Sequence, residues 1–118
     1  MARKRMIDPG IWDSEQVMQL SPIGFKLYVY LISQADDAGR VKLSYPMIIS
    51  RVFPFGGCDQ ECCREQVAAM DAAGLVSTYT VENIEYLEHP NWNLYQKIDR
   101  PQKSKLPKSP FVDDSTNV

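Results

Sequence analysis

The clearest hydrophobic pattern in this chain of 118 residues lies in the stretch 59–73. There Cys63, Val67 and Met70 recur at spacings of four and three, which gives a helix one apolar face. Asp59 suits the N-cap, because its carboxylate can accept a hydrogen bond from an amide of the first turn. The pattern therefore predicts a helix over 59–73 whose apolar face is buried.

Two β-type runs follow this helix directly. Gly74 suits the left-handed position after the last helical turn, and residues 75–81 are rich in β-branched and aromatic side chains. Residues 84–88 have a similar composition after Glu82-Asn83, which fits a tight connection. We expect 75–81 and 84–88 to pair as an antiparallel hairpin.

The first half of the chain predicts three helices and a strand. Ser21-Pro22 begins the most regular helix, since proline fits the first helical position and the apolar residues that follow form a broad face including Leu27 and Leu31. The other expected elements are a short helix from Asp13 or Ser14 to Leu20, a strand over 40–43, a helix capped by Ser44 that runs through Val52, and a loop at 54–57.

This order of elements predicts an α+β fold: a winged helix-turn-helix with an N-terminal helical extension and a flexible C-terminal tail. The domain is expected to cover residues 1–96, and residues 97–118 are expected to form a basic, proline-containing linker or tail. No run of about 18 apolar residues occurs, and the basic start lacks the apolar stretch of a signal peptide. We therefore expect a cytoplasmic protein with no membrane contact.

The sequence gives little support for catalysis or for a metal site. Cys58, Cys62 and Cys63 do not combine with His89 in a common zinc spacing, so we interpret the cysteines as packing residues of a reduced protein, and adjacent Cys62 and Cys63 are not expected to pair. No nucleophile motif accompanies His89, which we interpret as an ordinary turn or surface histidine. Asp36-Asp37, followed by Ala-Gly, indicates a turn in which aspartate side chains bond nearby amides. We expect no enzyme activity and no cofactor.

Charge is divided unevenly along the chain. Residues 6–96 hold five Lys/Arg against twelve Asp/Glu, a net charge of −7. Residues 3–5 carry three positive charges, and residues 97–110 carry five positive charges against one negative charge. The helix expected at 59–73 has four acidic residues against one basic residue, Arg64. Because DNA affinity depends mainly on neutralising phosphates, this composition disfavours insertion of that helix into a DNA groove and favours contact through the basic ends.

Several short motifs occur in a recognisable order. They are Ile-Asp-Pro-Gly-Ile-Trp-Asp at 7–13, Leu-Ser-Pro at 20–22, Ala-Asp-Asp-Ala-Gly-Arg at 35–40, Val-Phe-Pro at 52–54, Ala-Gly-Leu at 73–75, Asn-Trp-Asn-Leu-Tyr-Gln-Lys-Ile-Asp-Arg-Pro at 91–101 and Ser-Lys-Leu-Pro at 104–107. Together, over roughly residues 5–108, they resemble the N-terminal domain of phage replication-initiation proteins, or replisome organisers, which are related to DnaD-type winged helices. The resemblance implies recognition of a phage origin or recruitment of helicase-loading proteins, together with self-association.

Two classes of function follow. The first is a DNA-binding replication-initiation domain. The second is a winged helix for protein interaction and oligomerisation that binds a replisome partner without contacting DNA; a transcriptional regulator is a further alternative. The candidate nucleic-acid-binding residues are Arg3, Lys4, Arg5, Arg40, Lys42, Arg51, Lys97, Arg100, Lys103, Lys105 and Lys108.

The large aromatic residues have two interpretations. Trp12, Phe53, Phe55, Trp92 and Tyr95 each need a large area to be buried, which favours positions in the core or in a flap over it. Trp12 and Trp92, however, flank the predicted core elements, and with Tyr95 they are candidates for the interface of a homodimer. We expect a homodimer at micromolar concentration.

Overall fold

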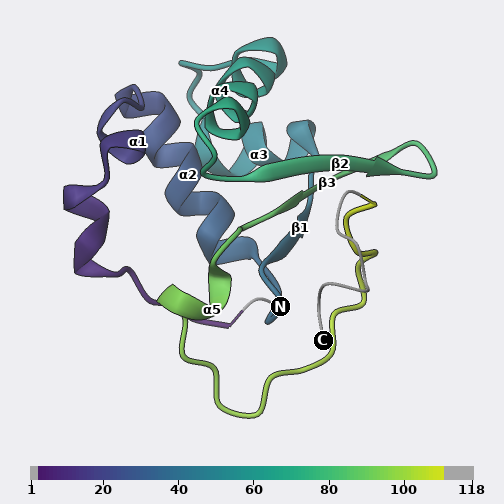
Figure 1. Cartoon of the computed structure of the whole chain (residues 1–118). Coiled ribbons are helices and arrows are strands. Elements are labelled where there is room, and N and C mark those ends of the chain that lie inside the picture. The colour runs from purple at the N-terminus through teal and green to yellow at the C-terminus, as the bar shows by residue number, and fades with distance from the viewer. Residues whose placement is uncertain (1–2, 111–118) are drawn as a thin grey trace.

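The structure is a computed structural model that describes residues 3–110. Within them, helices pack against a small three-stranded antiparallel sheet, so the predicted α+β class is confirmed (Figure 1). The elements in chain order are the 3-10 helix η1 (Pro9–Asp13), α1 (Glu15–Met18), α2 (Pro22–Gln34), β1 (Arg40–Lys42), α3 (Tyr45–Val52), α4 (Gln60–Ala72), β2 (Ser77–Val81), β3 (Ile84–Glu88) and α5 (Trp92–Tyr95). Neither η1 nor the single turn α5 was predicted from the sequence.

The predicted hairpin is confirmed, and it forms most of the sheet. β3 lies in the centre and pairs antiparallel with β2 on one side and with β1 on the other. Leu87 of β3 stands opposite Thr78 and opposite Val41. The two residues Glu82 and Asn83 connect the strands, and both have positive φ. A two-residue hairpin turn requires this conformation if its twist is to match that of the two strands.

The core lies where α2 and α4 cross above the sheet. Leu27 and Leu31 of α2 are fully buried and share one apolar cluster with Val67 and Met70 of α4, as the spacing predicts, and with Leu87 of β3. Burying each such side chain contributes about 1.5–3 kcal/mol relative to leaving it in water. This packing, rather than the length of the individual helices, fixes α4 against the rest of the molecule.

The ends of α4 are closed by the local interactions expected for them. The Asp59 carboxylate accepts a hydrogen bond from the Cys62 amide at 2.8 Å. At the other end Gly74 has φ +81°, and the Leu75 amide donates to the Met70 carbonyl oxygen at 3.0 Å, which closes the helix in a Schellman-type turn. Only the cap predicted at Ser44 differs, since its side chain makes no capping hydrogen bond to α3.

The turn after α2 is built as the sequence indicates. One oxygen of the Asp36 carboxylate accepts hydrogen bonds from the Ala38 amide at 2.9 Å and the Arg40 amide at 3.0 Å. Gly39 has φ +84°, and a Cβ there would lie 2.7 Å from Cγ of Trp92. Glycine is therefore required both by the backbone and by the close approach of the tryptophan ring.

Both ends of the described chain are attached to this turn. Arg5 donates to the Asp37 carboxylate at 3.0 Å, and both side chains are almost fully buried. The Gln102 amide donates to the second Asp37 oxygen at 2.8 Å, and the Ser104 hydroxyl donates to Asp36 at 2.5 Å. Residues 97–110 therefore do not extend away from the body as a free tail, since the carboxylates of the turn accept hydrogen bonds from them; residues 111–118 lie outside the described residues.

The Asp37 contacts lead to a prediction about acid stability. The Gln102 amide and the Arg5 guanidinium hold the pKa of the Asp37 carboxyl below its usual value of 3.8. A lowered folded-state pKa contributes stability that is complete above about pH 4 and is lost as the pH falls through the folded-state value. We expect Asp37→Asn to lower the melting temperature at pH 7, to speed hydrogen exchange at the Gln102 amide, and to remove this acid-sensitive component.

Asp13→Asn is the matched control, because Asp13 is exposed. It should leave both the melting temperature and the exchange rate of the Gln102 amide unchanged. Equal exchange rates in Asp37→Asn and the wild-type protein would show that the turn does not hold the C-terminal segment.

Candidate nucleic-acid interface

One face of the sheet is covered by the C-terminal segment instead of by helices. Along β3, Leu87 points into the core, so its neighbour Tyr86 points to the opposite face. In β2, Tyr79 stands opposite Tyr86, and the two rings stack with centroids 5.6 Å apart. The Tyr79 hydroxyl donates to the Pro107 carbonyl oxygen at 2.7 Å. Burial, and then the charge of Glu88, raise the pKa of Tyr79 to about 12.

Residues 97–110 therefore form a strap, anchored at Asp36, Asp37 and Tyr79, that returns alongside the strands (Figure 1). Ser104 is an anchoring residue, whereas the lysines on either side of it are exposed. Lys42 pairs in register with Tyr86, so it lies on the same face of the sheet as the two tyrosines. The exposed cations of this surface, which we call the strap surface, are Lys42, Lys97, Arg100, Lys103, Lys105 and Lys108.

The remaining candidate cations differ in how far the fold engages them. Arg5 is bound to Asp37, and Arg40 donates to Glu88 at 3.2 Å, so the charges of both are neutralised within the fold. Arg3 donates to the Asp99 carbonyl oxygen at 3.0 Å and lies 3.8 Å from Asp37. Lys4 and Arg51 are exposed, and Arg51 donates to Gln34 at 3.2 Å.

The exposed face of α4 is acidic, and its one basic residue is engaged. Arg64 donates to Glu85 of β3 at 3.0 Å and lies 4.2 Å above the ring of Tyr45. Burial and the Glu85 carboxylate raise the pKa of Tyr45 to about 12. Glu61 and Glu65 are exposed on the same helix. A phosphate backbone approaching α4 would meet carboxylates with no available cation from that helix to offset them.

The aromatic residues divide between the two interpretations. Phe53 and Trp92 are buried in the core cluster, so the idea that Trp92 lies outside the core is wrong. Its indole N–H donates to the Asp37 carbonyl oxygen at 3.0 Å, which fixes the ring over the turn. Trp12 is 63% exposed and stacks on Phe25, and Tyr95 is 50% exposed.

His89 is not a surface residue, contrary to our interpretation of the sequence. Its ring is buried, stacks on Trp92 with centroids 5.4 Å apart, and has Nε2 3.0 Å from the Leu31 carbonyl oxygen. Since a carbonyl only accepts, Nε2 carries the proton in the neutral ring. Burial lowers the pKa of His89, although the bond to Leu31 acts in the opposite direction. The sequence contained no signal for this position, because burial of His89 depends on Trp92 folding back over α2.

A cavity of about 200 Å³ opens between the N-terminal residues, α2 and α5. Its lining includes Met6, Ile7, Tyr28, His89 and Tyr95. Burial, and then the neighbouring Tyr95, raise the pKa of Tyr28. The lining combines aromatic and aliphatic side chains with polar ones such as Asp8 and Gln96, and it includes no Lys or Arg that could attract a phosphate.

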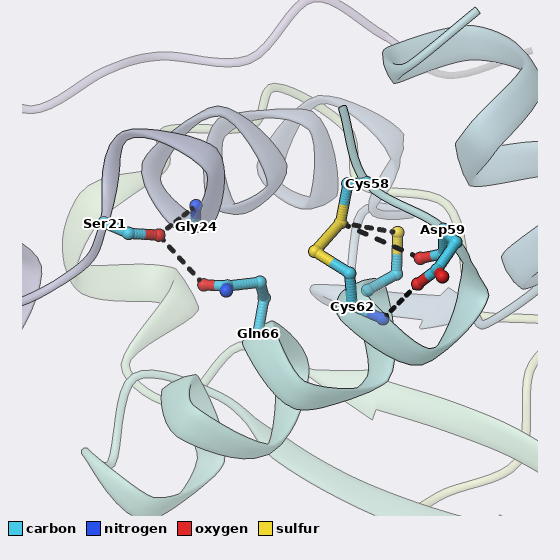
Figure 2. The surroundings of a disulfide bond; sticks show 7 residues. Ser21, Gly24, Cys58, Asp59, Cys62 and Gln66 are labelled. Carbon is cyan, nitrogen blue, oxygen red and sulfur yellow. Dashed lines mark hydrogen bonds between the residues drawn. A yellow bond between two sulfur atoms is a disulfide. The ribbon is translucent and has the colours of Figure 1, made fainter. Parts of the chain in front are cut away.

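The cysteines also differ from the expectation of reduced packing residues. Cys58 and Cys62 form a disulfide (Figure 2), and Cys63 is a buried thiol. Cys58 precedes the Asp59 cap and can therefore turn back toward Cys62, a pairing that the interpretation of the cysteines as reduced residues left out. Within residues 3–110, no group of three or more His, Cys, Asp or Glu side chains is arranged to hold a metal ion.

Comparison with protein-family models, with curated proteins and with solved structures finds no match to this chain. Among the helices of the described residues, none is long and apolar enough to cross a membrane.

The buried state of His89 predicts a loss of stability in mild acid. Its folded-state pKa lies below the ordinary 6.5, so a proton binds the unfolded chain more readily. The free energy of unfolding should be constant above about pH 7 and should fall as the pH drops below 6.5, by up to about 1.4 kcal/mol per pH unit until the folded-state pKa is reached. Urea unfolding at closely spaced pH values measures this.

His89→Gln is the informative variant, since His89 is the single histidine of the chain and glutamine can still donate to the Leu31 carbonyl. The variant should show nearly constant stability between pH 7 and pH 5. A slope equal to that of the wild-type protein would assign the effect to other groups.

Proposed function

We propose that this chain is a winged-helix DNA-binding domain of a phage-type replication-initiation protein. The order helix, strand, helix, helix, hairpin from α2 to β3 supports the winged-helix assignment, with α4 in the position of the recognition helix and β2–β3 as the wing. The replication role rests on the motifs that resemble replisome organisers, several of which the fold uses: the turn at 35–40, the Schellman-type end of α4 at 73–75 and the strap.

The strap surface is the observation that supports DNA binding most directly. Five of its six cations lie on the strap, which is hydrogen-bonded to the body at three anchors, so less chain entropy is lost when they contact phosphates than for a free tail. The acidic face of α4 argues against groove insertion by that helix. We therefore propose phosphate contact through the strap surface, with little preference for sequence, as the mode of DNA binding.

The test is fluorescence anisotropy with two duplexes of unrelated sequence over a series of salt concentrations. We expect similar affinities for both duplexes, weak binding at physiological salt, and a logarithmic salt slope that corresponds to about three to six released counterions. Replacing Lys103 and Lys105 by glutamine should reduce the magnitude of that slope by about two and weaken binding to both duplexes equally. Neither lysine is an anchor of the strap, so the fold should be retained.

The matched control neutralises two charges on α4, with Glu61→Gln and Glu65→Gln. This variant should leave the salt slope unchanged, since the helix faces away from the phosphates in the proposed mode. If α4 contacted the DNA, the control variant would bind markedly more tightly, the protein would distinguish the two duplexes, and the lysine substitutions would not change the affinity. That result would exclude the strap surface as the DNA site.

A homodimer or replisome-partner interface is a second candidate, favoured by a separate surface. Met6, Ile7 and Tyr95 line the cavity and are each about half exposed, and Leu94 beside them is 75% exposed. Exposed apolar side chains gathered around a recess are typical of protein interfaces. Trp12, on the same N-terminal extension, adds to the exposed apolar area.

Sedimentation velocity at micromolar concentration tests this second candidate. We expect a dimer for the wild-type protein and a shift toward monomer for Tyr95→Glu, because a charge at the rim would have to be desolvated in the interface. Phe55→Glu is the control, since Phe55 is likewise an aromatic residue that solvent reaches, fully exposed in its case, but it lies in the loop between α3 and α4. A wild-type protein that is strictly monomeric would exclude the homodimer, and DNA binding would remain the proposed function.

A further inference from the structure

Three sulfur atoms meet at the start of α4. Cys58 and Cys62 are joined by a disulfide that spans the Asp59 cap (Figure 2). Sγ of Cys63 lies 3.6 Å from Sγ of Cys58. Adjacent side chains of a helix point about 100° apart, so Cys62 and Cys63 approach Cys58 from different sides. Cys58 is therefore in contact with two sulfurs at once, one bonded and one not.

We propose that Cys58, Cys62 and Cys63 form a thiol–disulfide exchange site in which Cys58 is the sulfur shared by two alternative partners. The thiolate of Cys63 attacks Sγ of Cys58, the Cys58–Cys62 bond breaks as the Cys58–Cys63 bond forms, and Cys62 leaves as a thiolate. The proton lost by Cys63 is balanced by the proton that Cys62 takes up. No electrons are gained or lost overall, so the exchange needs no oxidant.

The exchange moves a thiol from the core toward the surface. Cys63 is fully buried, whereas Cys62 is partly exposed. The thiol therefore passes from a position that reagents cannot reach to one that a small disulfide of the glutathione class can attack, with a mixed disulfide and a free small thiol as products. Two small thiols reduce the protein disulfide by the reverse chemistry.

The surroundings of the cysteines include one feature that slows the exchange and one that favours it. Burial, and then the carboxylate of Asp59, raise the pKa of the Cys63 thiol, which keeps it protonated and slows its attack. The leaving group sits in the first turn of α4, where the helix dipole favours a negative charge on Cys62. The site therefore rests as the Cys58–Cys62 disulfide and exchanges slowly.

Differential labelling of the oxidised full chain tests the site. The folded protein is treated with N-ethylmaleimide, then unfolded, reduced and labelled with a heavy form of the same reagent. Cleavage after Arg51 and Arg64 gives one peptide containing all three cysteines, and its tandem fragmentation locates each label. We expect the first label predominantly on Cys62, with Cys58 and Cys63 carrying the heavy form.

Two variants separate exchange from simple opening of the fold. Cys62→Ala refolded in the presence of glutathione disulfide should close a Cys58–Cys63 bond, because those sulfurs lie in contact in the folded chain. Cys63→Ala should keep the Cys58–Cys62 bond and take up no label while folded. Circular dichroism checks that each variant folds.

Three results would overturn the proposal. They are a first label on Cys63 alone, no label within hours in the wild-type protein, or a Cys62→Ala variant that is folded yet leaves Cys58 and Cys63 as thiols or as separate mixed disulfides. None of these outcomes depends on DNA binding, so the sulfur site and the proposed function stand or fall separately.

Discussion

The Asp36-Asp37 turn is the constraint on which the arrangement of the molecule depends. A buried carboxylate must be matched by donors, and Asp37 obtains them from Arg5 near one end of the chain and from the Gln102 amide near the other. Gly39 in the same turn leaves room for Trp92. Four segments far apart in sequence thus meet at one point. The strap, the position of α5 and the burial of His89 all follow from that meeting.

This arrangement also separates charge on the surface. The strap brings lysines to the face of the sheet that carries Tyr79 and Tyr86, while α4 lies on the other face. Arg64 is engaged with Glu85 and Tyr45, so the exposed part of α4 is dominated by carboxylates. The fold therefore offers an anion-attracting face and an anion-repelling face. In the proposed mode, phosphate contact through the strap would leave α4 and the recess near α5 available for proteins, so the two proposed functions are compatible.

Local chemistry explains why much of the fold could be predicted from the sequence. The spacing of Cys63, Val67 and Met70, the cap at Asp59 and the glycine at 74 each act within one helix, so the residues alone determine where α4 begins and ends. The hairpin at 77–88 and the hydrogen bonds of Asp36 to its own turn are equally local. The number of charged residues in a segment is also independent of folding, which is why the acidic character of α4 could be predicted from the sequence.

The tertiary structure decided which of those groups remain accessible. Arg5 and Arg40 count as cations in the sequence, yet each meets a carboxylate from a distant segment. His89 and Trp92 become core residues because the chain after β3 folds back over α2, and the tail becomes a strap because the turn needs its donors. The Cys58–Cys62 bond depends on where the helix begins, since one residue before the cap can turn back. Sequence patterns report local periodicity and charge, whereas burial and pairing between distant residues depend on how the elements pack.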